Sequence, residues 1–162
     1  PTRHTPMKLA ILAVGHKLPD WVAAGCAEYV KRMPRELPLS IVEIKPEARG
    51  SKTREQLLSA EKSRLQAALQ GFQRLVVLDE RGEDLNTLKL AQRLEAWMRE
   101  GGDTAFIIGS ADGIDEGLKQ SAHATLRLSS LTLPHAMARL ILCEQLYRAH
   151  SVIRNHPYHR EG

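Results

Sequence analysis

The chain has 162 residues, of which 43% are hydrophobic and 26% charged, the composition of an ordinary globular domain. Its 23 Lys and Arg against 19 Asp and Glu give a net charge of +4, a modest bias toward polyanionic partners. The apolar runs are far shorter than the ~20 residues of a membrane-spanning helix, and no secretion signal is recognisable. We therefore expect a cytoplasmic protein with no membrane contact.

Strands and helices are expected to alternate, because short apolar runs are separated by longer segments with apolar residues at helical spacing. Asp20 is expected to cap the first helix and Gly71 to close the second. The expected strands cover residues 8–14, 39–45, 74–79, 104–109 and 125–129. The expected helices cover residues 21–32, 54–70, 87–100, 115–122 and 136–153.

Five such strand and helix units predict an α/β fold in which helices cover a mostly parallel sheet. Residues 74–79 and 104–109 are nearly continuous apolar runs, which is typical of buried parallel strands. We expect a single domain over residues 7–162, preceded by a disordered extension over residues 1–6. The tail after residue 153 shows no periodicity.

Several common chemistries lack their motifs. There is no G-x-G-x-x-G, no G-x-x-x-x-G-K-[ST], no G-x-S-x-G and no H-E-x-x-H, which disfavours the corresponding NAD, ATP, serine-hydrolase and zinc-protease sites. Cys26 and Cys143 form no C-x-x-C pair and are expected to be buried apolar residues. His156 and His159 lack a third ligand at a suitable spacing, so we predict no metal site.

Three segments in the C-terminal half are candidates for ligand binding. Gly109 and Gly113 enclose a loop directly after an apolar strand, where a ligand can approach the backbone closely. Residues 128–135 alternate apolar and hydroxyl side chains, which suits an adenine-sized pocket. The end of the chain combines cations, imidazoles and a phenol that suit RNA, namely Arg148, His150, Arg154, Asn155, His156, Tyr158, His159 and Arg160.

Taken together, these segments closely resemble the bacterial ribosomal RNA large-subunit methyltransferase H family, which belongs to the SPOUT class. The resemblance runs in order from Met7 to Glu161. The matching segments are AVG (13–15), VVLDERG (76–82), IIG with the glycine four residues on (107–113), LSSLTLPH (128–135), EQLYRA (144–149) and NHPYHRE (155–161).

The resemblance implies a SPOUT-type α/β fold with a C-terminal trefoil knot, a homodimer, and S-adenosylmethionine bound in the knotted loops. The implied reaction methylates N3 of a pseudouridine in 23S rRNA, in the stem-loop that faces the decoding region of the assembled 70S ribosome. Where relatives often have a double glycine, this chain has Gly109-Ser110, followed by Ala111-Asp112. By motif match, the cofactor would contact Leu78, Gly109, Leu128, Ser129, Ser130, Leu131, Thr132 and Leu133.

The predicted catalytic residues are Arg148 and His159. A cation near a weakly acidic imide nitrogen stabilises its anion, so Arg148 is expected to stabilise the deprotonated base or its phosphate. His159 or His135 could accept the proton, since an unperturbed imidazole titrates near neutral pH. The nucleotide would be positioned by His156, Tyr158, His159 or Arg160. In a dimer, the basic tail of one subunit would complete the pocket of the other.

Two alternatives remain from other classes. A flavodoxin-like small-ligand protein fits the alternation of strands and helices, although residues 15–19 are not a hydroxyl-rich phosphate loop. A ribosome-binding factor without catalysis fits the basic tail, and it would not need the loop at residues 128–133.

Overall fold

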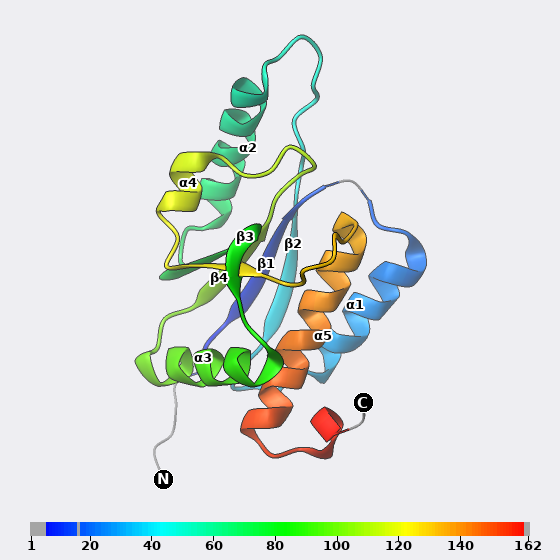
Figure 1. Ribbon diagram of the computed structural model, residues 1–162, viewed down its shortest axis with the longest axis vertical. Helices are drawn as coiled ribbons and strands as arrows, with labels where there is room; N and C mark the ends of the chain where they lie inside the picture. The colour runs from blue at the N-terminus through cyan, green and yellow to red at the C-terminus, as the bar shows by residue number, and fades with distance from the viewer. Residues whose placement is uncertain (1–5, 16, 161–162) are drawn as a thin grey trace.

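The computed structural model describes residues 6–15 and 17–160. The expected disordered extension therefore falls almost wholly outside the described residues, as does Glu161. Five parallel strands form one sheet in the order β2-β1-β4-β3-β5 (Figure 1). Their bounds are β1 (Leu9–Val14), β2 (Leu39–Ile44), β3 (Arg74–Asp84), β4 (Thr104–Ile108) and β5 (Ala124–Arg127).

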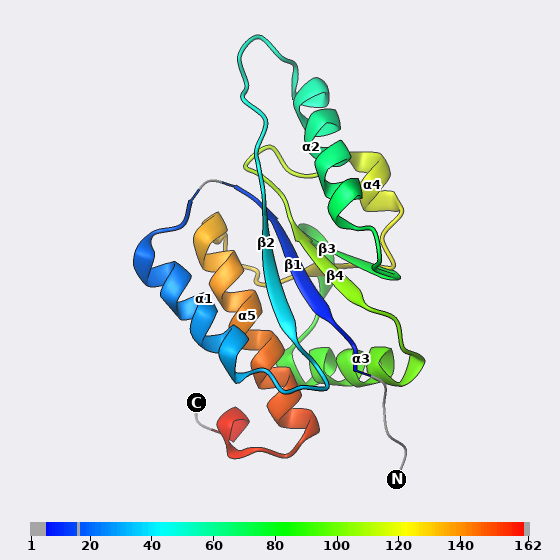
Figure 2. The ribbon, with the colours of Figure 1, turned by 180° about the vertical axis from the view of Figure 1, so that it is seen from behind.

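Helices cover both faces of the sheet (Figure 2). Successive side chains of β1 point to opposite faces of the sheet, and each face has its own apolar cluster. Leu9 and Ile11 pack into one cluster, and Ala10 and Leu12 pack into the other. The first cluster contains buried residues of α1 (Asp20–Arg32), α3 (Thr87–Glu100) and α5 (His135–Ile153). The second contains those of α2 (Arg54–Ala68) and α4 (Glu116–Gln120). None of the helices in the described ranges is long and apolar enough to cross a membrane.

The predicted α/β fold with a parallel sheet is confirmed, and most element bounds agree within three residues. Two predicted caps are wrong. Asp20 is the first residue of α1, and the preceding Pro19 caps the helix without a side-chain hydrogen bond. Helix α2 ends before Gly71, with Leu69 as its C-cap. Its start is fixed by Thr53, which exchanges hydrogen bonds with Gln56 in a capping box.

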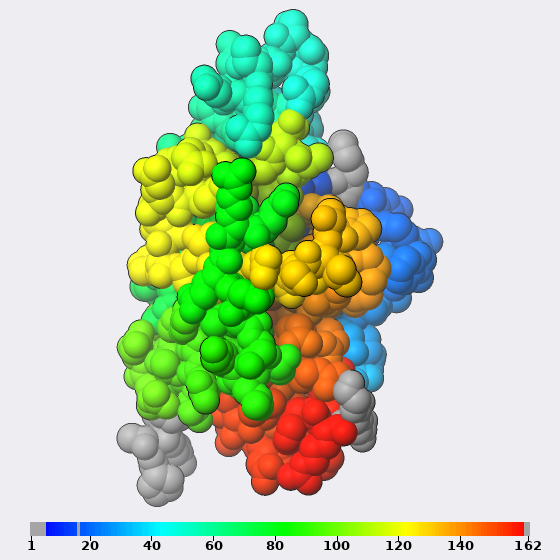
Figure 3. All heavy atoms as spheres, viewed as in Figure 1, coloured from blue at the N-terminus to red at the C-terminus, as the bar shows by residue number. Residues whose placement is uncertain are grey.

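Strand β3 continues five residues beyond its predicted end, through the polar segment 79–84. This segment crosses β5, since Leu78 and Glu83 both pair with Leu126. At the crossing, a Cβ on Gly82 would lie 2.6 Å from the carbonyl carbon of Leu126, so only glycine fits. Figure 3 shows the green atoms of this segment lying over the yellow atoms that precede α5. The trefoil knot itself stays a prediction.

The tail is more regular than its sequence indicates. Residues Pro157–Arg160 form a short 3-10 helix, η1, after the end of α5. Asn155 makes the reversal between the two helices with a φ of 54°, a conformation that asparagine tolerates better than most residues. The tail therefore folds back onto α5.

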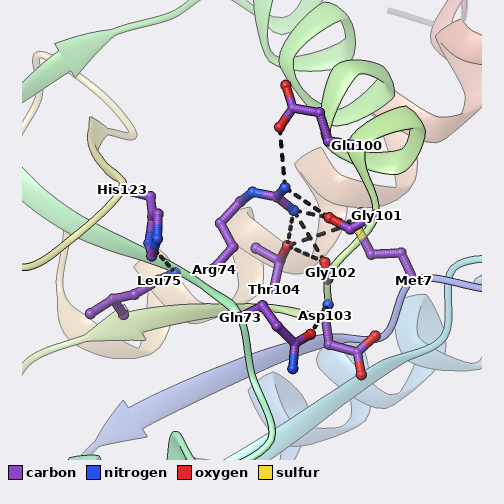
Figure 4. A network of polar contacts seen from close by, with 10 residues as sticks. All are labelled: Met7, Gln73, Arg74, Leu75, Glu100, Gly101, Gly102, Asp103, Thr104 and His123. Carbon is purple, nitrogen blue, oxygen red and sulfur yellow. Dashed lines mark hydrogen bonds and ion pairs between the residues drawn. The ribbon is translucent and has the colours of Figure 1, made fainter.

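The amino-terminal edge of the sheet is closed by a network around Arg74 (Figure 4). Its guanidinium donates to the carbonyl of Gly101 at 2.9 Å, to that of Gly102 at 3.1 Å and to the Thr104 hydroxyl at 2.9 Å. The two loops named as ligand candidates follow strands β4 and β5, and so lie at the opposite edge.

Candidate active site

The topology places a crevice between β1 and β4. These strands are neighbours, but α1 after β1 and α4 after β4 leave toward opposite faces of the sheet. Ligands of open α/β sheets collect at such a switch point. Here the imidazole of His135 lies against β1, since a Cβ on Gly15 would come within 3.1 Å of His135 Nε2. A side chain at position 15 would therefore press on His135, and the imidazole occupies the position where a flavodoxin-like protein would hold its ligand.

His135 is hydrogen-bonded at both ring nitrogens. Nδ1 lies 3.1 Å from the carbonyl oxygen of Gly109, and Nε2 lies 3.0 Å from Nη2 of Arg139. Burial and the Arg139 charge lower the pKa of His135, against a smaller opposing effect of the Gly109 hydrogen bond. The lone pair that a proton acceptor needs is therefore directed at Arg139, which argues against His135 as the general base.

Arg139 is completely buried, although it carries a full charge. Its Nη1 donates to Glu43 at 3.2 Å, and Glu43 itself is 57% exposed. Its Nε is buried and has no hydrogen-bond partner in the described part of the chain. A buried guanidinium with one ion pair is costly, so its position needs a reason beyond stability.

The loop after β4 is held by short contacts on every side. A Cβ on Gly109 would lie 2.6 Å from the Gly113 carbonyl oxygen, so the loop closes on itself only because Gly109 has no side chain. Ser110 donates from its hydroxyl to the buried carboxylate of Glu61 at 2.9 Å. Asp112 forms an ion pair with Arg49 and accepts from Arg54 Nε at its carbonyl, at 3.0 Å. These contacts restrain the loop.

The predicted cofactor residues come from three neighbouring strands, β4, β3 and β5. Leu78 is half-buried in β3, and Gly109 follows β4. Leu128 to Leu133 form the connection from β5 to α5 and not the end of a strand, which corrects the predicted bound. The hydroxyl of Ser129 accepts from the Leu131 amide at 2.9 Å, and Leu131 is 75% exposed. Ser130 and Thr132 are also exposed.

Arg148 and His159, the predicted catalytic pair, line one open pocket of about 410 Å³. The pocket lies between the start of α3, the later turns of α5 and η1. Its other lining residues are Thr87, Leu88, Glu144, Gln145 and Val152. Nδ1 of His159 is buried and has no hydrogen-bond partner among the described residues.

Glu144 organises this pocket, and the sequence reasoning missed it. Its Oε2 accepts from Arg148 Nε at 2.8 Å and from the Tyr158 hydroxyl at 2.9 Å. The guanidinium of Arg148 also lies 4.8 Å from the centre of the Tyr158 ring. The i, i+4 spacing of Glu144 and Arg148 on a helix was the available signal.

The phenol of Tyr158 stays protonated, so it does not act as a base at neutral pH. Burial and hydrogen bonds with Tyr29 and Glu144 raise its pKa well above the ordinary value, so the phenol stays protonated at neutral pH. The two other predicted positioning residues do not line the pocket. His156 accepts from the Tyr158 amide at 3.1 Å, and Arg160 donates to Asn155 at 2.9 Å.

The two parts of the predicted site lie at opposite ends of α5. His135 begins the helix beside the loop that follows β4, and Arg148 follows 13 residues later. At 1.5 Å per residue their Cα atoms are about 20 Å apart. Figure 1 shows the same separation, with the start of α5 in light orange at the upper end and the red tail at the lower end. One chain therefore does not bring both parts together.

Both cysteines are buried, as predicted, and they interact with each other. The Cys143 thiol and the charge of Arg139 lower the pKa of Cys26 to about 7, although burial opposes this. Within residues 6–15 and 17–160 no three His, Cys, Asp or Glu side chains are arranged to hold a metal ion.

A doubly covered parallel sheet, with glycine-containing loops at its carboxyl edge and a polar pocket beside its last helix, defines an α/β protein of the doubly wound class. The family described as "Predicted SPOUT methyltransferase" matches residues 7–159, and the chain belongs to this family. The ribosomal RNA large subunit methyltransferase H of Dechloromonas aromatica is 72% identical over 156 residues, covering 96% of this chain and 100% of that protein. The same-named protein of Burkholderia thailandensis is 57% identical over 155 residues, covering 95% of this chain and 99% of its own length.

Solved structures agree on the fold. A probable methylase family protein from Haemophilus influenzae has a TM-score of 0.56 at 15% identity, covering 98% of this chain and 70% of that chain. A probable methyltransferase from Bordetella pertussis has a TM-score of 0.56 at 16% identity, covering 89% and 94%. These identities are too low to carry more than the fold.

Proposed function

We propose that the protein transfers a methyl group from S-adenosylmethionine to RNA of the large ribosomal subunit. The observation that carries this proposal is the 72% identity to a ribosomal RNA large subunit methyltransferase over nearly the whole chain. The pocket lined by Arg148 and His159 supports the proposal, because it brings together a cation and an imidazole that such a reaction can use.

The loops at the carboxyl edge fit the cofactor. The loop from Gly109 to Gly113 packs on itself so closely that no Cβ fits at Gly109, and glycine there lets a ligand approach the backbone. Leu131 exposes an apolar side chain beside the half-buried Leu128 and Leu133, as the walls of an adenine site require. We propose that these residues, with Leu78, Ser129, Ser130 and Thr132, bind the cofactor, which supplies an activated methyl group on a sulfonium.

The proposed acceptor is N3 of a pseudouridine in 23S rRNA within the assembled 70S ribosome. Methylation at this nitrogen requires loss of its proton, and Arg148 would stabilise the resulting anion. His159 is the better candidate for the proton acceptor, because the lone pair of His135 is occupied and Tyr158 stays protonated. With a net charge of only +4, tight binding would depend on ribosome shape more than on phosphate contacts. A ribosomal substrate also supports a cytoplasmic location for the protein.

We further propose that a homodimer forms the complete site. The separation of about 20 Å along α5 leaves the cofactor loops of one chain without a catalytic pocket beside them. A largely apolar groove between α1 and β2, lined by Ala23, Ala27, Val30 and Ile41 among others, supports a contact with a second copy on this face.

Methyl transfer from labelled S-adenosylmethionine tests the reaction and its substrate. The acceptors are ribosomes that lack the modification, their separated subunits and free rRNA. We expect label at a single pseudouridine and chiefly in assembled ribosomes. Label in none of the three acceptors, with cofactor binding intact, would refute the proposed substrate, and equal label in free rRNA would refute the dependence on assembly.

Mixed dimers test the shared site. An Arg148→Ala subunit and a Gly109→Val subunit are each expected to be inactive alone. If each site combines both chains, random mixing restores about a quarter of wild-type activity, because half of the dimers are mixed and each has one intact site. If both parts of the site belong to one chain, mixing restores nothing.

A further inference from the structure

His135 connects three parts of the carboxyl edge of the sheet. It begins α5, packs on Gly15 at the end of β1, and bonds to the carbonyl of Gly109 at the end of β4. Arg139, one turn further along α5, reaches the same ring and continues to Glu43 on β2. The chain of contacts therefore runs from the cofactor loop to the far edge strand.

The partners decide which nitrogen carries the proton. A guanidinium has only donors and stays charged in proteins, so Nη2 of Arg139 donates and His135 Nε2 accepts. The ring is then neutral, and its single proton lies on Nδ1, which donates to the Gly109 carbonyl at 3.1 Å. A protonated ring would place a second cation 3.0 Å from Arg139 and would remove the acceptor.

The carbonyl of Gly109 in turn sets the direction of the next amide. A trans peptide is planar, so a carbonyl turned toward α5 turns the Ser110 N–H away from it. The hydroxyl of Ser110 is held on the other side of the loop by Glu61, which is only 2% exposed. The peptide between Gly109 and Ser110 is thus fixed from both sides before the cofactor arrives.

We propose that His135, kept as the neutral Nδ1–H tautomer by Arg139, is a positioning residue that orients the Gly109–Ser110 peptide for cofactor binding. This inference rests on the proposed cofactor site. The inference explains why a charged residue is buried at position 139, since an apolar side chain of similar size would pack there without fixing the tautomer of His135.

The inference predicts a loss of cofactor affinity at low pH. Among the described residues, the charged groups that face His135 are Arg139 on α5 and, behind it, Glu43 on β2. Gly15 after β1 and Gly109 after β4 contribute backbone atoms. Burial and Arg139 place the pKa of His135 below 6.5. Affinity should therefore be full at neutral pH and fall as the pH drops through this lowered pKa, by up to about tenfold per pH unit for one proton.

Three substitutions separate positioning from mere packing. In His135→Asn the amide nitrogen falls near the place of Nδ1 and can still donate to Gly109, whereas in His135→Gln it falls near Nε2. His135→Leu fills the space without any donor. We expect the dissociation constant for S-adenosylmethionine, measured by calorimetry on the full chain, to stay within about threefold for Asn and to rise about tenfold for Gln and Leu. His123→Asn, near the opposite edge of the sheet beside Leu75, is the matched control and should bind as the wild type does.

Two further readouts decide the matter even if one variant folds poorly. The dissociation constant of the wild type should rise between pH 7 and pH 5, while that of His135→Asn changes much less. The ¹⁵N chemical shifts of the His135 ring should report the Nδ1–H tautomer at pH 7. Equal pH dependence in the two proteins, an Nε2–H tautomer, or wild-type affinity in His135→Leu would each overturn the proposal. Because these measurements use cofactor binding alone, failure of methyl transfer to ribosomes leaves them untouched and refutes only the proposed substrate.

Discussion

The phenol of Tyr158 donates a hydrogen bond to the carboxylate of Glu144 across 2.9 Å and so fixes η1 against α5. Because this proton points to Glu144, the Tyr29 hydroxyl is the donor in the 3.0 Å contact between the two phenols. One carboxylate on α5 therefore sets the positions of both Arg148 and the tail.

Tyr158→Phe removes a donor and an acceptor from this cluster while it keeps the ring. We expect the free energy of unfolding to fall by about 1–3 kcal/mol, because Glu144 and Tyr29 both lose a half-buried partner. Urea denaturation measures the change. Tyr147→Phe keeps a ring packed 4.7 Å from that of Tyr158 and serves as the control with a smaller expected loss. Equal losses in the two variants would contradict the assigned hydrogen bonds.

Arg148→Ala should reduce methyl transfer on the order of a hundredfold, since a positioned charge at the reacting base is lost. The affinity for S-adenosylmethionine should barely change, because Arg148 lies at the other end of α5 from the cofactor loops. Single-turnover rates and calorimetry measure the two quantities. Arg99→Ala removes an exposed cation from α3 and should alter neither. If Arg148→Ala lowered the affinity for S-adenosylmethionine as much as it lowers methyl transfer, Arg148 would not act on the reacting base as proposed.

The Ser110 hydroxyl and the buried Glu61 carboxylate should be coupled energetically. Ser110→Ala leaves Glu61 Oε1 short of a partner and is expected to lower the free energy of unfolding by about 1–3 kcal/mol. In a Glu61→Ala background the same substitution should cost much less. A double-mutant cycle by urea denaturation gives the coupling directly. Additive effects of the two substitutions would show that the hydrogen bond contributes nothing.

Gly82→Ala should destabilise the protein by about 3 kcal/mol or prevent folding, because the new methyl would meet the backbone of Leu126. Backbone atoms at the crossing of β3 over β5 cannot move aside as a side chain does. Gly117→Ala, on α4, meets only side-chain atoms of Asp115 and Lys62 and provides the comparison. Thermal unfolding and expression yield are the measurements. Similar stabilities of the two variants would mean that the backbone at the crossing can move to accommodate a methyl group.

Stability should fall as the pH drops below 6.5. Burial is the main cause that lowers the pKa of both His135 and His150 below this ordinary value. The unfolded chain then binds these protons more readily than the folded chain, so the free energy of unfolding rises with pH across this range. Urea denaturation at pH 7, 6 and 5 measures the slope. The double variant His135→Asn with His150→Asn should flatten it, and an unchanged slope would assign the effect to other groups.

The sequence predicted most of the fold because buried strands and their boundaries depend on local pattern. The run 104–109 is apolar throughout, and Gly and Pro mark the ends of several elements. The capping box at Thr53 could also have been found, since threonine is followed three residues later by Gln56. The extension of β3 could not, because residues 79–84 are mostly charged and become strand only by crossing β5.

The site was predicted less completely, for a similar reason. Arg148 and His159 do share a pocket, but the organising role of Glu144 depends on a tail that shows no periodicity. The i, i+4 spacing of His135 and Arg139 is visible in the sequence. The Gly109 carbonyl, which is the second hydrogen-bond partner of His135, lies 26 residues away and is not. Every residue has a backbone carbonyl, so the sequence does not indicate which carbonyl a distant side chain will contact.

The continuity of α5 fixes a register between its two ends. Inserting one residue between His135 and Glu144 would rotate one end against the other by about 100° and turn Arg148 and Tyr158 together away from Tyr29 on α1. Inserting a full turn would restore the face but lengthen the spacing by about 5.4 Å. If two copies share their sites, this length also sets how far one subunit must reach across the other. The number of residues in this helix is therefore as much a determinant of the site as their identity.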